Sequence, residues 1–314
     1  MAGAHLAAFY TTPKTVLDRR FDGMIITGAP VEILDFDAVD YWSELAGIMS
    51  LNRTHVWSTL HICWGAMAGL WHHFGIRKTP RDEKLFGVFE QRVTRPGNPL
   101  VRGFDDRFWA PHSRHTGLSA ADVRAAKGLR ILAEGDETGP YLLSTENGRQ
   151  IFVLGHPEYE LMTLDGEYRR DAGRGLGIRV PANCYPGDDS EKRPVCRWKS
   201  HAHLLYQNWL NYCVYQDTPY DLGRLAGIDR GCAPGGVSRI RRPETPPRGR
   251  KASGGVFFQP SGASGRARMR RIVRLRHLSD QPPSAFRSPP PCASAPSFRF
   301  PPAFTRRASA SFSH

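Results

Sequence analysis

The first two thirds of the chain alternate short apolar runs with amphipathic stretches, the pattern of strands and helices that follow one another. Strands are predicted at residues 24–27, 55–62, 85–93, 130–134, 141–144 and 150–154. Helices are predicted at residues 41–51, 63–70 and 201–214. This alternation favours an α/β fold, with a doubly wound, mostly parallel sheet covered by helices on both faces.

The pattern ends after Leu222. Pro, Arg, Ser, Gly and Ala dominate residues 233–314, and such a segment cannot bury enough apolar surface to offset the entropy of ordering it. We therefore predict one folded domain over residues 1–222 and a disordered tail over residues 223–314.

Charge is distributed just as unevenly. The formal net charge is +13, but the tail holds 18 of the 43 basic residues and 3 of the 30 acidic ones, which leaves 25 basic and 27 acidic residues before it. A basic excess suggests nucleic acid or a membrane surface as partner. Since no RNA-binding module accompanies it, a solvated tail is favoured over a nucleic-acid-binding arm. The apolar stretch at residues 60–71 is too short to span a bilayer, so no membrane partner is expected.

The six cysteines are scattered, with no C-x-x-C pair. This spacing matches neither a zinc site nor a disulfide framework, and it predicts free thiols in a cytoplasmic protein without a metal site. No secretory signal precedes the first predicted strand.

Cys63 lies where a predicted strand runs into a predicted helix, among small residues. A cysteine at such an elbow is lifted clear of the sheet, and the helix N-terminus favours its thiolate. Backbone N–H groups that follow it, starting at Trp64, would receive a developing oxyanion. On this segment alone, a buried structural cysteine is an equal alternative.

His156 follows the strand at residues 150–154 and precedes Pro157 and Glu158. A histidine at a strand end can act as general base to a thiol, and a glutamate two residues later can turn back to hold its other ring nitrogen. Together with Cys63, these residues predict a Cys-His-Glu triad.

These residues are where the chain resembles a known family. Cys63 with His156-Pro157-Glu158 resembles the class I glutamine amidotransferase-like superfamily, whose fold is flavodoxin-like. The surrounding sequence is similar to the homoserine O-acyltransferases, also called the homoserine O-succinyltransferase family. The matching stretches run in order at residues 21–30, 41–42, 58–64, 102–106, 110–114, 155–159, 208–212 and 218–222.

The resemblance implies a ping-pong acyl transfer to the hydroxyl of L-homoserine, on the path to methionine. Cys63 would carry the acyl group, His156 would be the general base and Glu158 would orient it. Lys84, Ser113 and Arg170 match substrate-binding residues of the family; without the resemblance, Lys84 and Arg170 would be interpreted as solvated charges and Ser113 as an ordinary loop hydroxyl. The family also implies a homodimer and no cofactor beyond the acyl-CoA co-substrate.

The acyl donor depends on Glu32, two residues after Gly28-Ala29-Pro30. In the family this position resembles a selectivity switch, with Gly accompanying succinyl transfer and Glu accompanying acetyl transfer, and Ser113 is a second position linked to donor choice. A glutamate would fill the space that a longer acyl chain needs and repel the carboxylate of a succinyl group. Acetyl-CoA is therefore the expected donor, although an exposed loop glutamate would look the same.

Two departures from the family matter. Family members begin with an additional segment that supplies a first strand and a lysine-containing loop, whereas this chain starts just before His5, so we expect an N-terminally truncated domain with an open sheet edge. The basic tail follows the family's usual end and suggests a shifted reading frame near residue 225. Three alternatives stay open: a succinyltransferase, a glutamine amidotransferase-like cysteine hydrolase, and an inactive truncated chain.

Overall fold

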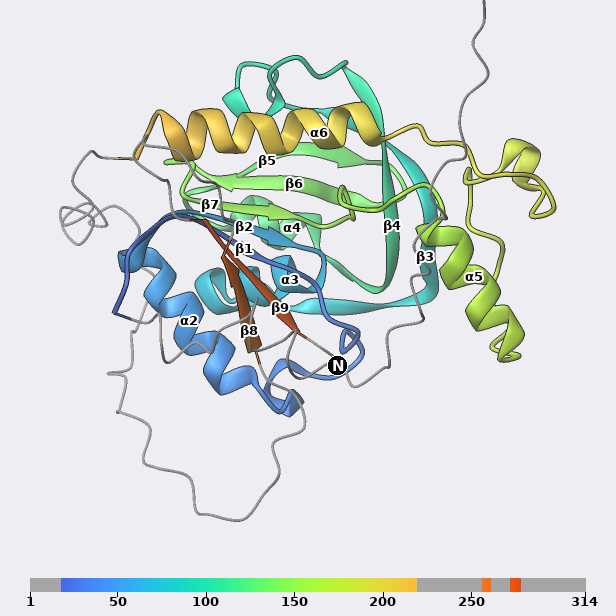
Figure 1. Cartoon of the computed structure of the whole chain (residues 1–314), viewed down its shortest axis with the longest axis horizontal. Helices are drawn as coiled ribbons and strands as arrows, with labels where there is room; N and C mark the ends of the chain where they lie inside the picture. Colours follow the sequence, from blue (N-terminus) through green and yellow to red (C-terminus); the bar gives the residue numbers. More distant parts are fainter. Residues whose placement is uncertain (1–17, 219–255, 261–271, 278–314) are drawn as a thin grey trace, which may run out of the picture. The chain divides into compact units, whose positions relative to one another are not determined.

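The computed structural model describes residues 18–218, 256–260 and 272–277 (Figure 1). The strands are β1 (Phe21–Ile26), β2 (Val56–Ile62), β3 (Lys78–Val93), β4 (Arg107–Leu118), β5 (Leu129–Gly135), β6 (Gly139–Thr145), β7 (Gln150–Val153), β8 (Val256–Pro260) and β9 (Ile272–His277). The α-helices are α2 (Trp42–His55), α3 (Trp64–Phe74), α4 (Ala120–Ala125), α5 (Thr163–Gly173) and α6 (Lys199–Asn208), and α6 continues as a π-helix, η5 (Trp209–Tyr215). Short 3₁₀ turns are η2 (Phe36–Ala38), η3 (Pro99–Val101) and η4 (Pro186–Asp188).

All of these strands belong to one sheet, in the order β4-β3-β5-β6-β7-β2-β1-β9-β8. The pairs β7–β2, β2–β1 and β1–β9 are parallel. The pairs β4–β3, β3–β5, β5–β6, β6–β7 and β8–β9 are antiparallel. Parallel pairing is thus confined to the part of the sheet that leads into α2 and α3.

Apolar side chains line both faces of the sheet. Side chains alternate between faces along a strand, and accordingly Phe152 packs into one cluster with α2 and α3, whereas Ile151 and Val153 pack into a second cluster with α6 and η5. Figure 1 shows α6 on the opposite side of the sheet from α2 and α3. The predicted α/β arrangement, with helices on both faces, is confirmed.

Fewer of the strand pairs are parallel than the prediction of a mostly parallel sheet implies. Five of the eight pairings among the described strands are antiparallel. For β5, β6 and β7 the reason is local: they are joined through short connections, and such connections allow only antiparallel neighbours. The hairpin predicted around Asn147-Gly148 is the β6–β7 pair.

The predicted tail contributes two strands. The segments VFFQP of β8 and IVRLRH of β9 are rich in residues with high strand propensity, and β9 pairs with β1. The predicted disordered tail thus includes two segments that form strands in the structure. The rest of the tail and residues 1–17 lie outside the described residues. The edge of β1 that was predicted to be open is occupied by β9. The domain boundary after Leu222 stays a prediction.

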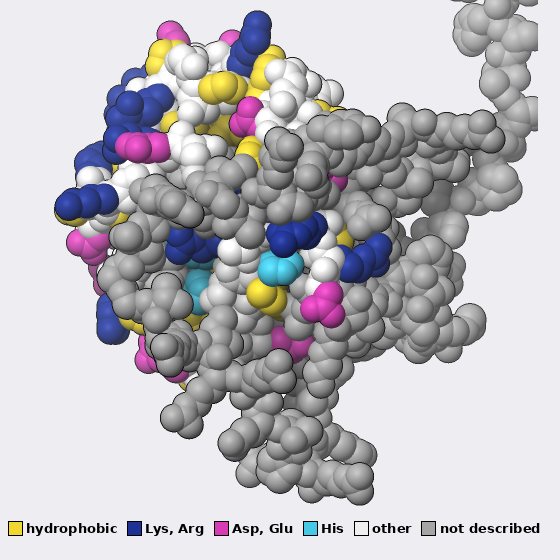
Figure 2. Space-filling model, turned by 90° about the vertical axis from the view of Figure 1, so that its left-hand side faces the viewer, with side chains coloured by type: hydrophobic (Ala, Val, Ile, Leu, Met, Phe, Trp, Pro, Cys, Tyr) yellow, Lys and Arg dark blue, Asp and Glu magenta, His cyan; other side chains and the backbone are white. Residues whose placement is uncertain are grey.

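Charge on the described surface is mixed. On the face in Figure 2, basic side chains lie among acidic and hydrophobic ones. None of the helices in the described part of the chain has the length and apolar composition of a membrane span.

Candidate active site

Cys63 lies at the junction of β2 and α3, directly before the first residue of the helix. Its backbone has φ 51° and ψ −118°, a conformation that non-glycine residues avoid at a cost of roughly 1–3 kcal/mol. The Cys63 N–H donates to the Val153 carbonyl at 2.7 Å, which ties the turn to β7. The predicted elbow is therefore present, and the strain places the thiol at the carboxyl end of the parallel strands.

Two glycines let the elbow pack closely. A Cβ on Gly65 would lie 2.7 Å from the Thr27 carbonyl oxygen, so only glycine lets α3 start this close to β1. A Cβ on Gly28 would lie 3.3 Å from the Cys63 Cβ and 3.5 Å from the Trp64 nitrogen. Trp64 opens α3, and N–H groups in the first turn of a helix have no acceptor within it. The loop after β1 thus faces an N–H that can bind an oxyanion.

His156 follows β7 and is buried, with 8% of its surface exposed. Its Nδ1 lies 2.8 Å from Glu158 Oε1, and its ring stacks on Tyr159 at 4.2 Å between centroids. Its backbone N–H donates to the Pro111 carbonyl of β4 at 2.8 Å. Glu158 and Tyr159 therefore hold the ring while the bond to Pro111 holds its backbone, and Nε2 is the nitrogen left to exchange a proton with a thiol.

The electrostatics of this histidine favour its charged form. Burial lowers the pKa of His156, but the Cys63 thiolate and the Glu158 carboxylate, which attract and hydrogen-bond the ring, outweigh burial and raise that pKa well above its usual value. The structure thus brings Cys63, His156 and Glu158 together, and their action as a triad stays a prediction.

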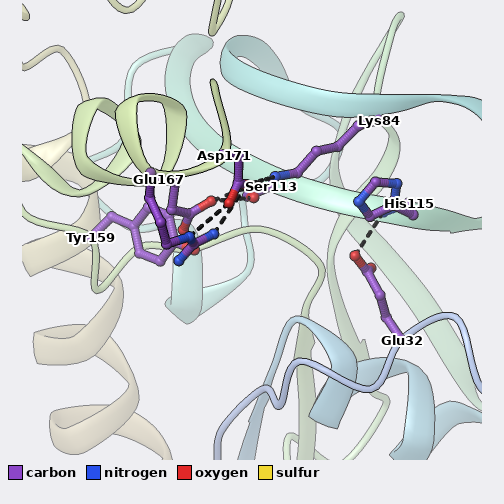
Figure 3. A network of polar contacts seen from close by, with 8 residues as sticks. Glu32, Lys84, Ser113, His115, Tyr159, Glu167 and Asp171 are labelled. Atoms are coloured by element: carbon purple, nitrogen blue, oxygen red, sulfur yellow. Dashed lines mark hydrogen bonds and ion pairs between the residues drawn. The ribbon is translucent and has the colours of Figure 1, made fainter. Parts of the chain in front are cut away.

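A second polar cluster lies beyond Tyr159 and is drawn in Figure 3. Glu167 of α5 accepts hydrogen bonds from Ser113 of β4 and from the Tyr159 hydroxyl, both at 2.6 Å. Lys84 of β3 lies 3.8 Å from Glu167 and 3.8 Å from Asp171. The predicted substrate residues Lys84 and Ser113 therefore meet at one carboxylate.

Arg170 contacts this cluster through Asp171. Its guanidinium donates to both oxygens of Asp171, at 2.7 and 3.1 Å, and about half of its side chain is exposed. The hydrogen bond from Arg170 lowers the pKa of Asp171, which keeps that carboxylate charged. Beside Lys84 and Asp171 lies a pocket of about 330 Å³ that His115 also lines.

Glu32 lies on the loop after β1, half-buried, and its Oε1 accepts the His115 N–H at 2.9 Å. Its Oε2 is buried and has no hydrogen-bond partner. Figure 3 shows Glu32 reaching towards His115, with Lys84 on the neighbouring strand. The predicted donor-selectivity residue thus contacts His115, which lines the pocket together with Lys84.

The sequence interpretation missed Glu167, Asp171 and the role of Tyr159. A usable signal was present for the first two, because Glu167, Arg170 and Asp171 are spaced i, i+3 and i+4 and share one face of a helix. That helix itself was not predicted. Among the described residues, no cluster of three His, Cys, Asp or Glu side chains could hold a metal ion.

Solved structures with a partial likeness include a glutamine amidotransferase from Thermotoga maritima, 12% identical, with a TM-score of 0.44 over 60% of this chain and 76% of that one. Another is a glutamine amidotransferase from Methylobacillus flagellatus, 8% identical, with a TM-score of 0.42 over 63% of this chain and 97% of that one.

Sequence relatives are much closer. A protein of Lachnoclostridium phytofermentans named homoserine O-acetyltransferase is 55% identical over 221 residues, which is 70% of this chain and 73% of the relative. A Petrotoga mobilis protein of the same name is 54% identical over 221 residues, 70% of this chain and 72% of the relative. The family model for homoserine O-succinyltransferase matches residues 1–220. The chain therefore belongs to the homoserine O-succinyltransferase family.

Proposed function

We propose that this protein is a homoserine O-acetyltransferase that carries the acetyl group on Cys63. The observation that carries the proposal is the strained Cys63 at the start of α3, coupled to a buried His156 that Glu158 holds at 2.8 Å. Relatives that share more than half of their aligned residues with this chain bear the same name. The proposed setting is the methionine pathway in the cytoplasm, with the protein as a homodimer.

In the first half-reaction, His156 takes the proton of the Cys63 thiol, and the thiolate attacks the carbonyl carbon of acetyl-CoA. The carbonyl π electrons move onto oxygen, and the N–H of Trp64 is the donor available for that oxyanion. Collapse breaks the bond to the CoA sulfur, which leaves with the proton from His156 as the free thiol. Cys63 then carries an acetyl thioester.

In the second half-reaction, the homoserine hydroxyl loses its proton to His156 while its oxygen attacks the thioester. Collapse returns the electron pair to the Cys63 sulfur, which regains the proton from His156, and O-acetylhomoserine leaves. Glu158 stabilises the charged imidazole at each stage, because it accepts from Nδ1 in both half-reactions.

Homoserine carries a carboxylate and an ammonium group, and the cluster around Glu167 offers charges of both signs. Lys84 and Arg170 are cations that can meet the carboxylate, and the guanidinium of Arg170 can donate two parallel hydrogen bonds. Glu167 can accept from the ammonium, and Ser113, which donates to it, can orient the substrate.

Glu32 is proposed to select the donor. Its buried, unpartnered Oε2 would face the distal carboxylate of a succinyl group, and like charges without solvent repel strongly. We expect Glu32→Gly to gain succinyl transfer to Cys63 while keeping acetyl transfer, as measured by the mass of the protein after each donor is added. A variant that loses acetyl transfer and gains no succinyl transfer would remove Glu32 from the proposal.

A homoserine O-succinyltransferase is the second candidate, since the family model carries that name. Intact-protein mass spectrometry after brief incubation with acetyl-CoA or with succinyl-CoA separates the two candidates, with Cys63→Ser as control. We expect one acetyl group on the protein, absent from the variant and discharged by homoserine. A succinyl adduct alone would favour the second candidate, and no adduct on a folded protein would contradict both.

A further inference from the structure

Arg114 of β4 is a buried cation that forms no ion pair with a described carboxylate. Only 1% of its surface is exposed, and its guanidinium donates to the carbonyls of Thr116 at 2.5 Å and Thr138 at 2.7 Å. Its Nε is buried and has no hydrogen-bond partner, and no described carboxylate lies within ion-pair distance of it. A buried charge is costly unless an opposite charge compensates it. Arg114 therefore needs an anion that the ion pairs of the described residues do not supply.

The position of Arg114 on β4 places it on the face of the strand that packs against α3, the helix that begins after Cys63. Side chains alternate along a strand, so His112, Arg114 and Thr116 share one face, and all three are buried. On this face the Thr116 hydroxyl donates to the sulfur of Met67 in α3 at 3.2 Å. At the other end of the same stretch, the Pro111 carbonyl accepts the His156 N–H. Arg114 thus lies between contacts to the general base and to the helix that Cys63 begins.

Two anions act on Arg114 at this position. Burial, and to a smaller extent the charge of Arg81, lower the pKa of its guanidinium to about 10, whereas the Cys63 thiolate and the Glu32 carboxylate act in the opposite direction. The guanidinium is therefore charged at neutral pH. The buried neighbour His112 cannot serve as a second cation, since burial and the charge of Arg114 lower the pKa of that imidazole well below its usual value.

We propose that Arg114 is a positioning residue whose buried positive charge favours the Cys63 thiolate, acting beside His156 and the N-terminus of α3. The inference rests on the proposed function, which makes Cys63 the nucleophile. The step it favours is transfer of the thiol proton from Cys63 to His156, which creates a thiolate and an imidazolium and leaves the total charge unchanged. Arg114 touches neither substrate nor reacting atoms; it sets the potential in which the sulfur ionises.

The alternative role for Arg114 is structural, because its guanidinium also joins the carbonyls of Thr116 and Thr138. A structural role predicts lower stability on substitution but no change in how readily Cys63 ionises. The two roles therefore predict different results for the ionisation of Cys63, which can be measured separately from enzyme activity.

The test is the pH dependence of Cys63 alkylation by iodoacetamide, followed by mass spectrometry of the peptide that contains Cys63. We expect Arg114→Met to slow alkylation at pH 6 roughly tenfold and to move the profile about one unit to higher pH, since a nearby cation no longer favours the thiolate. Arg114→Lys should stay near the unsubstituted protein. Arg107→Met is the matched control, because it removes an exposed arginine from the same strand.

An unmoved profile in a folded Arg114→Met protein would overturn the inference. If that variant does not fold, Arg114→Gln decides in its place, because its amide can still donate to one of the two carbonyls while the charge is gone. Failure of the proposed function would look different: the unsubstituted protein would then gain no acyl group from acetyl-CoA or succinyl-CoA, whatever the alkylation profile.

Discussion

At the scale of single residues, the site depends on groups kept in unfavourable states. Cys63 holds a positive φ, His156 is buried in a setting that favours its charged form, and Arg114 is a buried cation. Each state is costly alone, and the two charged states are favoured by the Cys63 thiolate. Substitutions of these residues should therefore change the reactivity of Cys63 more than the loss of the substituted side chain's own contacts suggests.

Glu158 is the clearest case. We expect Glu158→Gln to slow discharge of the acetyl-enzyme by homoserine at neutral pH roughly a hundredfold or more, because the carboxylate that raises the pKa of His156 is lost. Rapid quenching followed by mass spectrometry measures this step. Glu160→Gln is the matched control, since Glu160 is exposed and pairs with Lys199. Equal rates in both variants would mean that Glu158 does not act on His156.

Much of this site could be predicted from residues alone. Cys63, His156 and Glu158 lie close in sequence to strand ends, and strand ends meet at one edge of a parallel sheet. Glu167 and Arg114 could not be assigned in this way. Their importance comes from what surrounds them in space, since Glu167 is reached by Ser113 and Tyr159 from other elements, and Arg114 is significant only because it is buried.

At the scale of elements, the placement of the nucleophile depends on how tightly α3 starts against β1. We expect Gly65→Ala to lower the free energy of unfolding and to slow acylation of Cys63, because a methyl group would collide with the carbonyls of Ile26 and Thr27. Gly47→Ala, in α2, has open space around its Cβ and should instead stabilise the protein by up to about 1 kcal/mol. Urea unfolding of both variants measures the contrast, and a stable Gly65→Ala protein would contradict it.

Most strands before residue 154 were predicted, on both the parallel and the antiparallel side of the sheet, but β4, β8 and β9 were not. β2 and β7 are rich in apolar residues and buried along almost their whole length, as expected for strands covered on both faces. β4 was missed because its sequence RFWAPHSRHTGL places Pro, His, Ser and Arg where strand propensity is low. A proline fits there because β4 lies at the edge of the sheet.

At the scale of the whole molecule, buried neutral histidines make stability depend on pH. Burial lowers the pKa of His61 to about 4, and it lowers the pKa values of His73 and His112 well below the usual value. Below about pH 6.5 the unfolded chain binds protons that these folded rings cannot, so their contribution to stability is present above that pH and lost as pH falls. His156 acts in the opposite direction, because its folded pKa is raised.

We therefore expect the free energy of unfolding to fall between pH 7.5 and pH 5, with His61 accounting for roughly 2 kcal/mol of the loss. Urea unfolding at the two pH values measures it. His61→Gln should reduce the dependence, whereas His203→Gln, at an exposed position, should leave it unchanged. Equal dependence in the His61 variant and the unsubstituted protein would contradict this account.

The pairing of β1 with β9 has a consequence for the order in which the protein can form. Gly23 pairs with Ile272, so the two strands are separated by about 250 residues of chain. During synthesis β1 leaves the ribosome long before its outer partner β9 does. The β1–β2 pair and the α3 elbow can therefore form while translation continues, but closure of the sheet on that side must wait for one of the most distant contacts in the chain, a step that loop-closure entropy makes slow.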